Sequence, residues 1–138
     1  MKNNIIFKYQ LKDAWGMERS MIEITEEKEN NILIKEYGKE DITYASIDPN
    51  IIKEIISKCS EELKKCKEFP HAFVSDGYIN LFYFNINNQK YEIEINNLCY
   101  LEPNDKNVKL ILDIYKEIYN TLSPILGNRI KKSFVLKY

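Results

Sequence analysis

Glycine is scarce in this chain and never clustered. The 138 residues contain 4 glycines, which stand singly at Gly16, Gly38, Gly77 and Gly127. A P-loop or a dinucleotide-binding turn needs two or three glycines close together, so that the backbone can approach a phosphate. The sequence therefore excludes both of these nucleotide-binding motifs.

Histidine and cysteine, the usual ligands of zinc, are also few. The chain has one histidine, His71, and its three cysteines, Cys59, Cys66 and Cys99, form no C-x-x-C pair. A zinc site needs about four such ligands at suitable spacings. The sequence predicts no metal site and no resident cofactor. An odd number of cysteines without secretory context indicates reduced thiols and a cytoplasmic location.

Long hydrophobic runs and a strong excess of charge are both missing. The longest apolar runs, 81–84 and 98–101, have four residues, whereas a membrane span needs about 20 and a signal-peptide core about 7–15. Lys plus Arg number 20 against 21 Asp plus Glu, with only Arg19 and Arg129 as arginines. We therefore expect no membrane partner, and nucleic-acid binding is disfavoured.

What the sequence does contain fits one domain, 1–138. Hydrophobic residues make up 44% of the chain and the formal net charge is −1, a composition that is too apolar and too balanced in charge for disorder. A chain of this length buries about two thirds of its unfolded surface on folding. A single hydrophobic core can therefore hold it without disulfides or metals.

Hydrophobic periodicity predicts six strands and two helices. Strand patterns cover 4–11, 21–25, 32–37, 42–46, 78–86 and 89–96. Asp48 and Pro49 are start signals for a helix whose apolar stripe runs from Ile51 to Cys66. A second stripe runs from Val108 to Leu122, and Pro124 is expected to end that helix. The order ββββ-α-ββ-α predicts an α+β fold, an antiparallel sheet of about six strands with two amphipathic helices packed on one face.

Two arrangements of residues are candidates for a catalytic site. His71 could activate a cysteine as a thiolate nucleophile; Cys59 and Cys66 lie on or beside an apolar stripe, which leaves Cys99. Glu92 and Glu94 lie about 7 Å apart on one strand face, a separation that inverting glycosidases use. Alternating glutamates are, however, the ordinary pattern of a solvated strand face. The sequence therefore gives no firm catalytic residue.

Trp15 and the C-terminal segment are the features that suit binding. Trp15 is the only tryptophan and lies in a polar segment between two strands. Tryptophan is enriched in interface hot spots, but a loop tryptophan more commonly folds over the end of the core. The segment 129–138 has four basic residues and no acid. This segment is typical of a protected edge strand, with RNA contact as the alternative.

Residues 75–122 resemble the C-terminal half of small bacterial toxin-immunity proteins. The resemblance rests on Asp76-Gly77, the aromatic-rich hairpin, Pro103 and the amphipathic helix that begins near Val108. It implies an inhibitor that binds a cognate toxin stoichiometrically in the cytosol and performs no chemistry.

We therefore expect a non-enzymatic protein-binding domain, most specifically an immunity-type inhibitor of a basic toxin domain. Its binding surface is expected to include the loop aromatic Trp15 or the acidic hairpin tip formed by Glu26, Glu27 and Glu29, because carboxylates speed encounter with a basic partner. The alternative is a small hydrolase or ligand-binding domain that uses His71 and Cys99.

Overall fold

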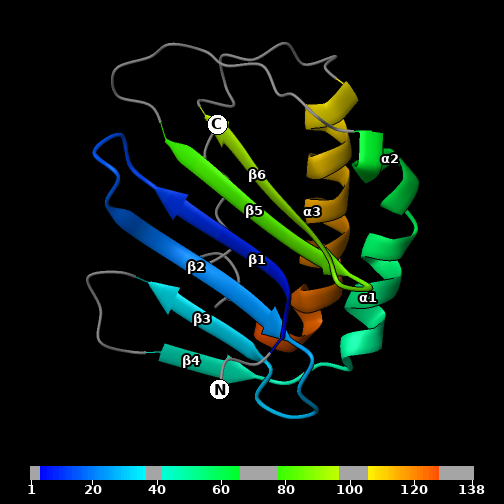
Figure 1. Cartoon of the computed structure of the whole chain (residues 1–138). Helices are drawn as coiled ribbons and strands as arrows, with labels where there is room; N and C mark the ends of the chain where they lie inside the picture. The colour runs from blue at the N-terminus through cyan, green and yellow to red at the C-terminus, as the bar shows by residue number, and fades with distance from the viewer. Residues whose placement is uncertain (1–3, 37–41, 66–77, 97–105, 128–138) are drawn as a thin grey trace.

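The computed structural model describes residues 4–36, 42–65, 78–96 and 106–127, and it is an α+β fold (Figure 1). Its strands are β1 (Ile5–Lys12), β2 (Glu18–Thr25), β3 (Ile32–Glu36), β4 (Ile42–Ala45), β5 (Ile79–Ile86) and β6 (Gln89–Asn96). Its helices are α1 (Pro49–Ser57), α2 (Ser60–Lys65) and α3 (Lys106–Leu126).

The six strands form one sheet in the order β4-β3-β2-β1-β5-β6, and every neighbouring pair is antiparallel. The first four strands follow one another as a meander, while the β5–β6 hairpin adds to the free side of β1. A two-residue turn, Asn87–Asn88, joins this hairpin, and both residues have positive φ, 50° and 67°. Asparagine tolerates this conformation, which matches the twist of the two strands. The predicted antiparallel sheet is confirmed.

The helices lie on one face of the sheet, behind it in Figure 1. Alternate strand residues on this face are almost fully buried, and they meet the apolar stripe of α3. Tyr115 of α3 contacts two rings of the sheet edge-on, with ring centroids 5.2 Å from Tyr9 and 6.1 Å from Phe82. Edge-to-face contacts of this kind stabilise aromatic pairs beyond the burial of their area. The core therefore lies between the sheet and the helices.

The first predicted helix is divided in two. Asp48 caps α1 by accepting a hydrogen bond of 3.0 Å from the backbone N–H of Asn50. The chain then tightens after Ser57, where the N–H of Cys59 bonds to the carbonyl of Ile56 three residues earlier. This shorter turn interrupts the α-helical ladder, and α2 begins at Ser60.

The expectation that Pro124 ends the second helix is wrong. The helix α3 continues to Leu126, and Gly127 follows with φ +57°. A proline in the last turn removes one backbone donor, while Leu122 and Leu126 continue the buried stripe on either side of it. The burial of Leu126 favours continuing the helix past Pro124, and the glycine supplies the left-handed residue that often follows a helix end. No helix of the described residues is both long and apolar enough for a membrane span.

Candidate functional site

The turn between β1 and β2 is built around one buried carboxylate. Asp13 is 7% exposed, and its Oδ1 accepts hydrogen bonds of 3.0 Å from the backbone N–H groups of Trp15 and Met17. Two further backbone bonds close the same turn, from the Asp13 N–H to the Met17 carbonyl and from the Gly16 N–H to the Asp13 carbonyl. Gly16 has φ +79°, a region that side chains rarely adopt. The turn is therefore held in one conformation.

Arg19 completes this arrangement from the start of β2. Its Nε and Nη2 atoms lie 3.1 Å and 2.9 Å from Oδ2 of Asp13. Burial by itself raises the pKa of Asp13, but the hydrogen bonds from Met17, Trp15 and Arg19 outweigh it and lower that pKa. Asp13 therefore carries its negative charge at neutral pH, and each of its oxygens is bonded.

The turn presents two large apolar side chains to solvent. Trp15 is 85% exposed and Met17 is 65% exposed, the two highest values among the large hydrophobic residues described. The alternative in which Trp15 folds over the end of the core is therefore wrong. The backbone N–H of Trp15 is bonded to Asp13, while its side chain extends into solvent. A rigid turn with an exposed tryptophan is the arrangement expected of a binding anchor.

The predicted acidic tip is the turn between β2 and β3, and only part of it carries free charge. Glu26 is engaged within the fold: Lys53 of α1 lies 2.8 Å from its Oε1, and Asn4 donates a 3.0 Å hydrogen bond to Oε2. The hydrogen bond from Lys53 is the main reason that the pKa of Glu26 is lowered. Glu27 and Glu29 are exposed, but Lys28 lies between them.

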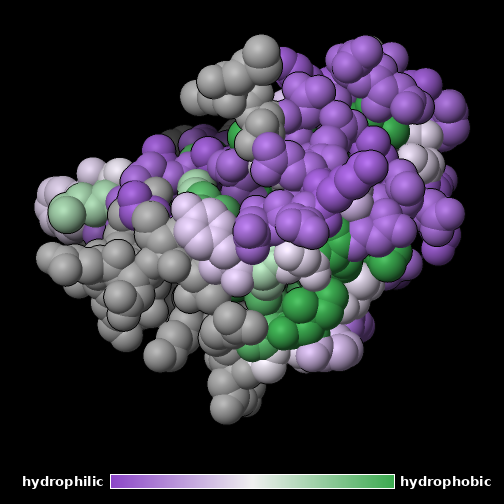
Figure 2. Space-filling view, turned by 90° about the horizontal axis from the view of Figure 1, so that it is seen from below, coloured by the Kyte–Doolittle hydropathy of each residue, from purple (hydrophilic) through white to green (hydrophobic). Residues whose placement is uncertain are grey.

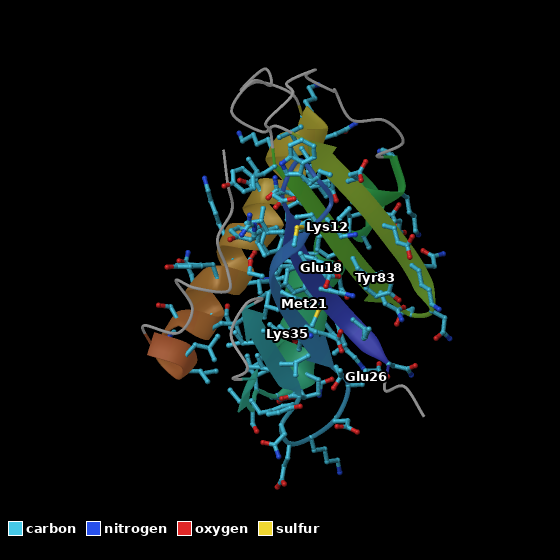
Figure 3. The ribbon with its side chains drawn as sticks, turned by 90° about the vertical axis from the view of Figure 1, so that its left-hand side faces the viewer. Lys12, Glu18, Met21, Glu26, Lys35 and Tyr83 are labelled. Carbon is cyan, nitrogen blue, oxygen red and sulfur yellow. The ribbon has the colours of Figure 1, made fainter. Side chains whose placement is uncertain are left out.

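The structure does not bring Trp15 and the acidic tip together. They lie at opposite ends of β2, an eight-residue strand that spans about 25 Å. Figure 3 shows this separation for Glu18, the first residue of β2, and Glu26, which follows its last residue. Figure 2 looks at the molecule from the end with the acidic tip, where hydrophilic residues gather on one side of the view and a hydrophobic area lies next to them.

The face of the sheet opposite the helices, called the open face below, carries a shallow hollow. It has a volume of about 450 Å³ and lies over β1, β5 and β6. Its side chains come from Lys8, Gln10, Leu81, Tyr83, Glu92 and Glu94. Tyr83 points away from α3 in Figure 3. Leu81 and Tyr83 are half-buried, whereas both glutamates are exposed. The hollow therefore joins an apolar floor to an acidic rim.

The predicted enzymatic candidates gain no support from the described residues. His71, Cys66 and Cys99 lie outside them, as do 75–77 and the basic segment 129–138. Cys59 packs against the core as a partly buried residue, and burial raises the pKa of its thiol. Glu92 and Glu94 are both exposed on one strand face, which is the ordinary pattern of a solvated strand.

Two features of the site escaped the sequence reasoning. Met17 was not singled out beside Trp15, and Asp13 was not recognised as the residue that organises their turn. A signal was present in the sequence, because Asp13 stands three residues before Gly16, and aspartate followed closely by glycine is typical of a turn. The hollow had no local signal, because its residues come from β1 and from the β5–β6 hairpin, which are distant from each other in sequence.

The comparisons with known proteins add no relative. Searches against family models, curated proteins and solved structures find no match to the chain. Among the described residues no group of three or more His, Cys, Asp or Glu side chains is arranged to hold a metal ion.

Proposed function

We propose that this chain is a protein-binding domain that acts by masking its partner, in the manner of an immunity-type toxin inhibitor. The observation that carries the proposal is the exposure of Trp15 and Met17 on a turn fixed by Asp13. A fixed turn loses little conformational entropy when a partner binds. Tryptophan then supplies a large apolar anchor, and methionine adapts its shape to the partner surface.

The toxin-inhibitor form of this proposal rests on the resemblance of residues 75–122 to immunity proteins. A toxin that acts on nucleic acid commonly carries positive charge, and Glu27 and Glu29 attract such a partner from a distance. The alternative, a hydrolase or ligand-binding domain that uses His71 and Cys99, stays a prediction on residues outside those described. Turnover of a small substrate that disappears in His71→Ala and Cys99→Ala would support it.

Affinity measurement with the purified partner tests the proposal. The partner is identified by capture from the native host and is then titrated against the wild type and against Trp15→Ala. The variant is expected to lose about 2 kcal/mol of binding free energy, roughly thirtyfold in Kd, as is typical of an interface hot spot. Tyr44→Ala is the matched control, because Tyr44 is also an exposed aromatic, at 55%, but lies on β4. Equal Kd values for Trp15→Ala and wild type would exclude this anchor.

A further inference from the structure

The outer edge of β6 borders the hollow of the open face, and the two features together define a second surface. We propose that β6 accepts an extended, basic segment of the partner protein as an added strand, with its Lys or Arg side chains lying along Glu92 and Glu94. This inference rests on the protein-binding function proposed above and specifies the chemistry of the partner.

Within the part of the chain that the structure describes, the outer edge of β6 is free for such pairing. In a hairpin with a two-residue turn, the two residues that flank the turn form a hydrogen-bonded pair. Here these residues are Ile86 and Gln89. Along the two strands from this point, hydrogen-bonded pairs alternate with pairs that exchange no hydrogen bonds. The N–H and carbonyl groups of Ile93 therefore face β5, whereas those of Glu92 and Glu94 point outward. Among the described strands only β5 pairs with β6. An incoming strand finds hydrogen-bonding groups at these two residues.

The side chains of the same two residues define the charge of the added strand. Glu92 lies opposite Tyr83 and Glu94 opposite Leu81, so neither has a charged neighbour on β5. Neither glutamate forms an ion pair with any of the described residues. Opposite charges across two paired strands attract, and like charges repel. Basic residues at the facing positions of an added strand would therefore find two unpaired carboxylates.

The hollow accommodates the length of a basic side chain. From the outer side of β6 a Lys or Arg stem can lie over Leu81, because such stems cover apolar surface while the charged end stays near water. An Arg head then reaches the face of Tyr83 as well as the carboxylates. Lys8 lies on the opposite side of the hollow. Its charge limits how far a cation can move toward β1, which keeps the cation close to Glu92 and Glu94.

Two other occupants fit less well. An acidic segment would place like charges opposite the two glutamates. A second copy of β6 paired around Ile93 would set Glu92 of one chain opposite Glu94 of the other, with the same repulsion. A basic segment from a partner has neither conflict.

Peptide binding to the whole chain tests the inference directly. The probe is a fluorescently labelled peptide of alternating Arg and Val, used at physiological salt so that screening beyond about 8 Å suppresses distant charges. We expect Glu92→Lys/Glu94→Lys to weaken binding about tenfold or more. Glu61→Lys/Glu62→Lys is the matched control, with the same change of charge at two exposed residues of α2, and should bind like the wild type.

Two further measurements separate strand addition from simple charge attraction. The same peptide with alternate backbone amides N-methylated keeps its charges but cannot complete the ladder, so it should bind much more weakly. The amides of Glu92 and Glu94 should exchange with solvent more slowly when the peptide is bound, while that of Ile93 changes little. Three outcomes would overturn the inference. The N-methylated peptide could bind as tightly as the unmodified one, or both charge-reversal variants could lose the same affinity for the peptide. Sedimentation could also show that the protein associates with itself through β6.

The natural partner distinguishes this inference from the proposed function. Loss of partner binding in Trp15→Ala, with no effect of Glu92→Lys/Glu94→Lys, would keep the proposed function and reject the role of β6. Loss in the β6 variant alone would retain β6 as the binding surface and reject Trp15 as the anchor.

Discussion

The hydroxyl of Tyr9 donates a 2.6 Å hydrogen bond to Oδ1 of Asn80, and both residues are completely buried. Asn80 in turn donates from Nδ2 to the carbonyl of Ile95, at 3.4 Å. These bonds connect β1, β5 and β6 within the apolar layer beneath α3. A polar group in such a layer is tolerated because it is hydrogen-bonded.

Replacing Tyr9 by Phe is expected to lower the free energy of unfolding by about 1 kcal/mol, the usual net contribution of one such bond. The ring and its contacts with Phe82 and Tyr115 are retained, so the loss reports the hydroxyl alone. Urea unfolding measures it. Tyr44→Phe, at an exposed position, is the control and should leave stability unchanged. Equal stability of both variants would show that the buried bond contributes nothing.

Ile118 tests the packing of α3 on the sheet. Its side chain is 0% exposed, and Ile118→Ala should cost about 2–5 kcal/mol, because it removes buried apolar volume and leaves a cavity. Ile51→Ala is the control, since Ile51 of α1 is 43% exposed and should cost much less. A loss below about half a kcal/mol for Ile118→Ala would mean that this face of α3 is not enclosed.

The lowered pKa of Asp13 predicts that the free energy of unfolding decreases in acid. Its pKa in the folded state lies below the ordinary value of 3.8, so folding favours the charged form. The resulting stability is fully present above pH 3.8 and is lost as the pH falls through the lower folded pKa. In urea unfolding at a series of pH values, the stability advantage of wild type over Asp13→Asn should shrink below that pH. A constant difference would show that the carboxylate charge does not matter.

Cys59 should react slowly in the native protein. Burial is the main cause that raises the pKa of its thiol, and the carboxylate of Glu62 adds to the effect. Less of the reactive thiolate is then present at neutral pH. With Cys66 and Cys99 replaced by serine, a thiol reagent should label Cys59 much faster in urea than in buffer. Equal rates would indicate that the thiol is accessible in the folded state.

The two ends of β2 should affect partner binding in different ways. Neutralising Glu27 and Glu29 should mainly slow association and reduce its dependence on salt, because exposed charges act on the encounter. Trp15→Ala should mainly speed dissociation, since a buried anchor acts after contact is made. Surface-based kinetics at several salt concentrations separates these effects. An unchanged dissociation rate for Trp15→Ala would argue against an anchor.

The sheet was predictable wherever its determinants are local. Strict alternation and the turn at Asn87–Asn88 gave β6 its observed bounds, 89–96, and Asp48-Pro49 marked the start of α1. The position of β5 beside β1 was not predictable, because those strands are paired across most of the chain and no residue in either one specifies that neighbour.

The errors arose where a single residue was judged without its surroundings. Pro124 is a helix breaker by propensity, yet the buried Leu126 extends the helix past it. For Trp15, the usual burial of large aromatics favoured the alternative in which it covers the core. The observed side chain is exposed and lies on a turn whose backbone is hydrogen-bonded to Asp13. For the candidate site, the sequence supplied Trp15 and the tip glutamates, but not the geometry that separates them.

The position of Trp15 also determines what intrinsic fluorescence can report. The chain has one tryptophan, and in the folded state its indole is 85% exposed, almost as much as in an unfolded chain. Its emission should therefore change little during denaturation, so circular dichroism is the better signal for stability measurements. When a partner covers the indole, the emission should shift to the blue. The fluorescence of Trp15 would then report complex formation without a label, while it changes little when the protein unfolds.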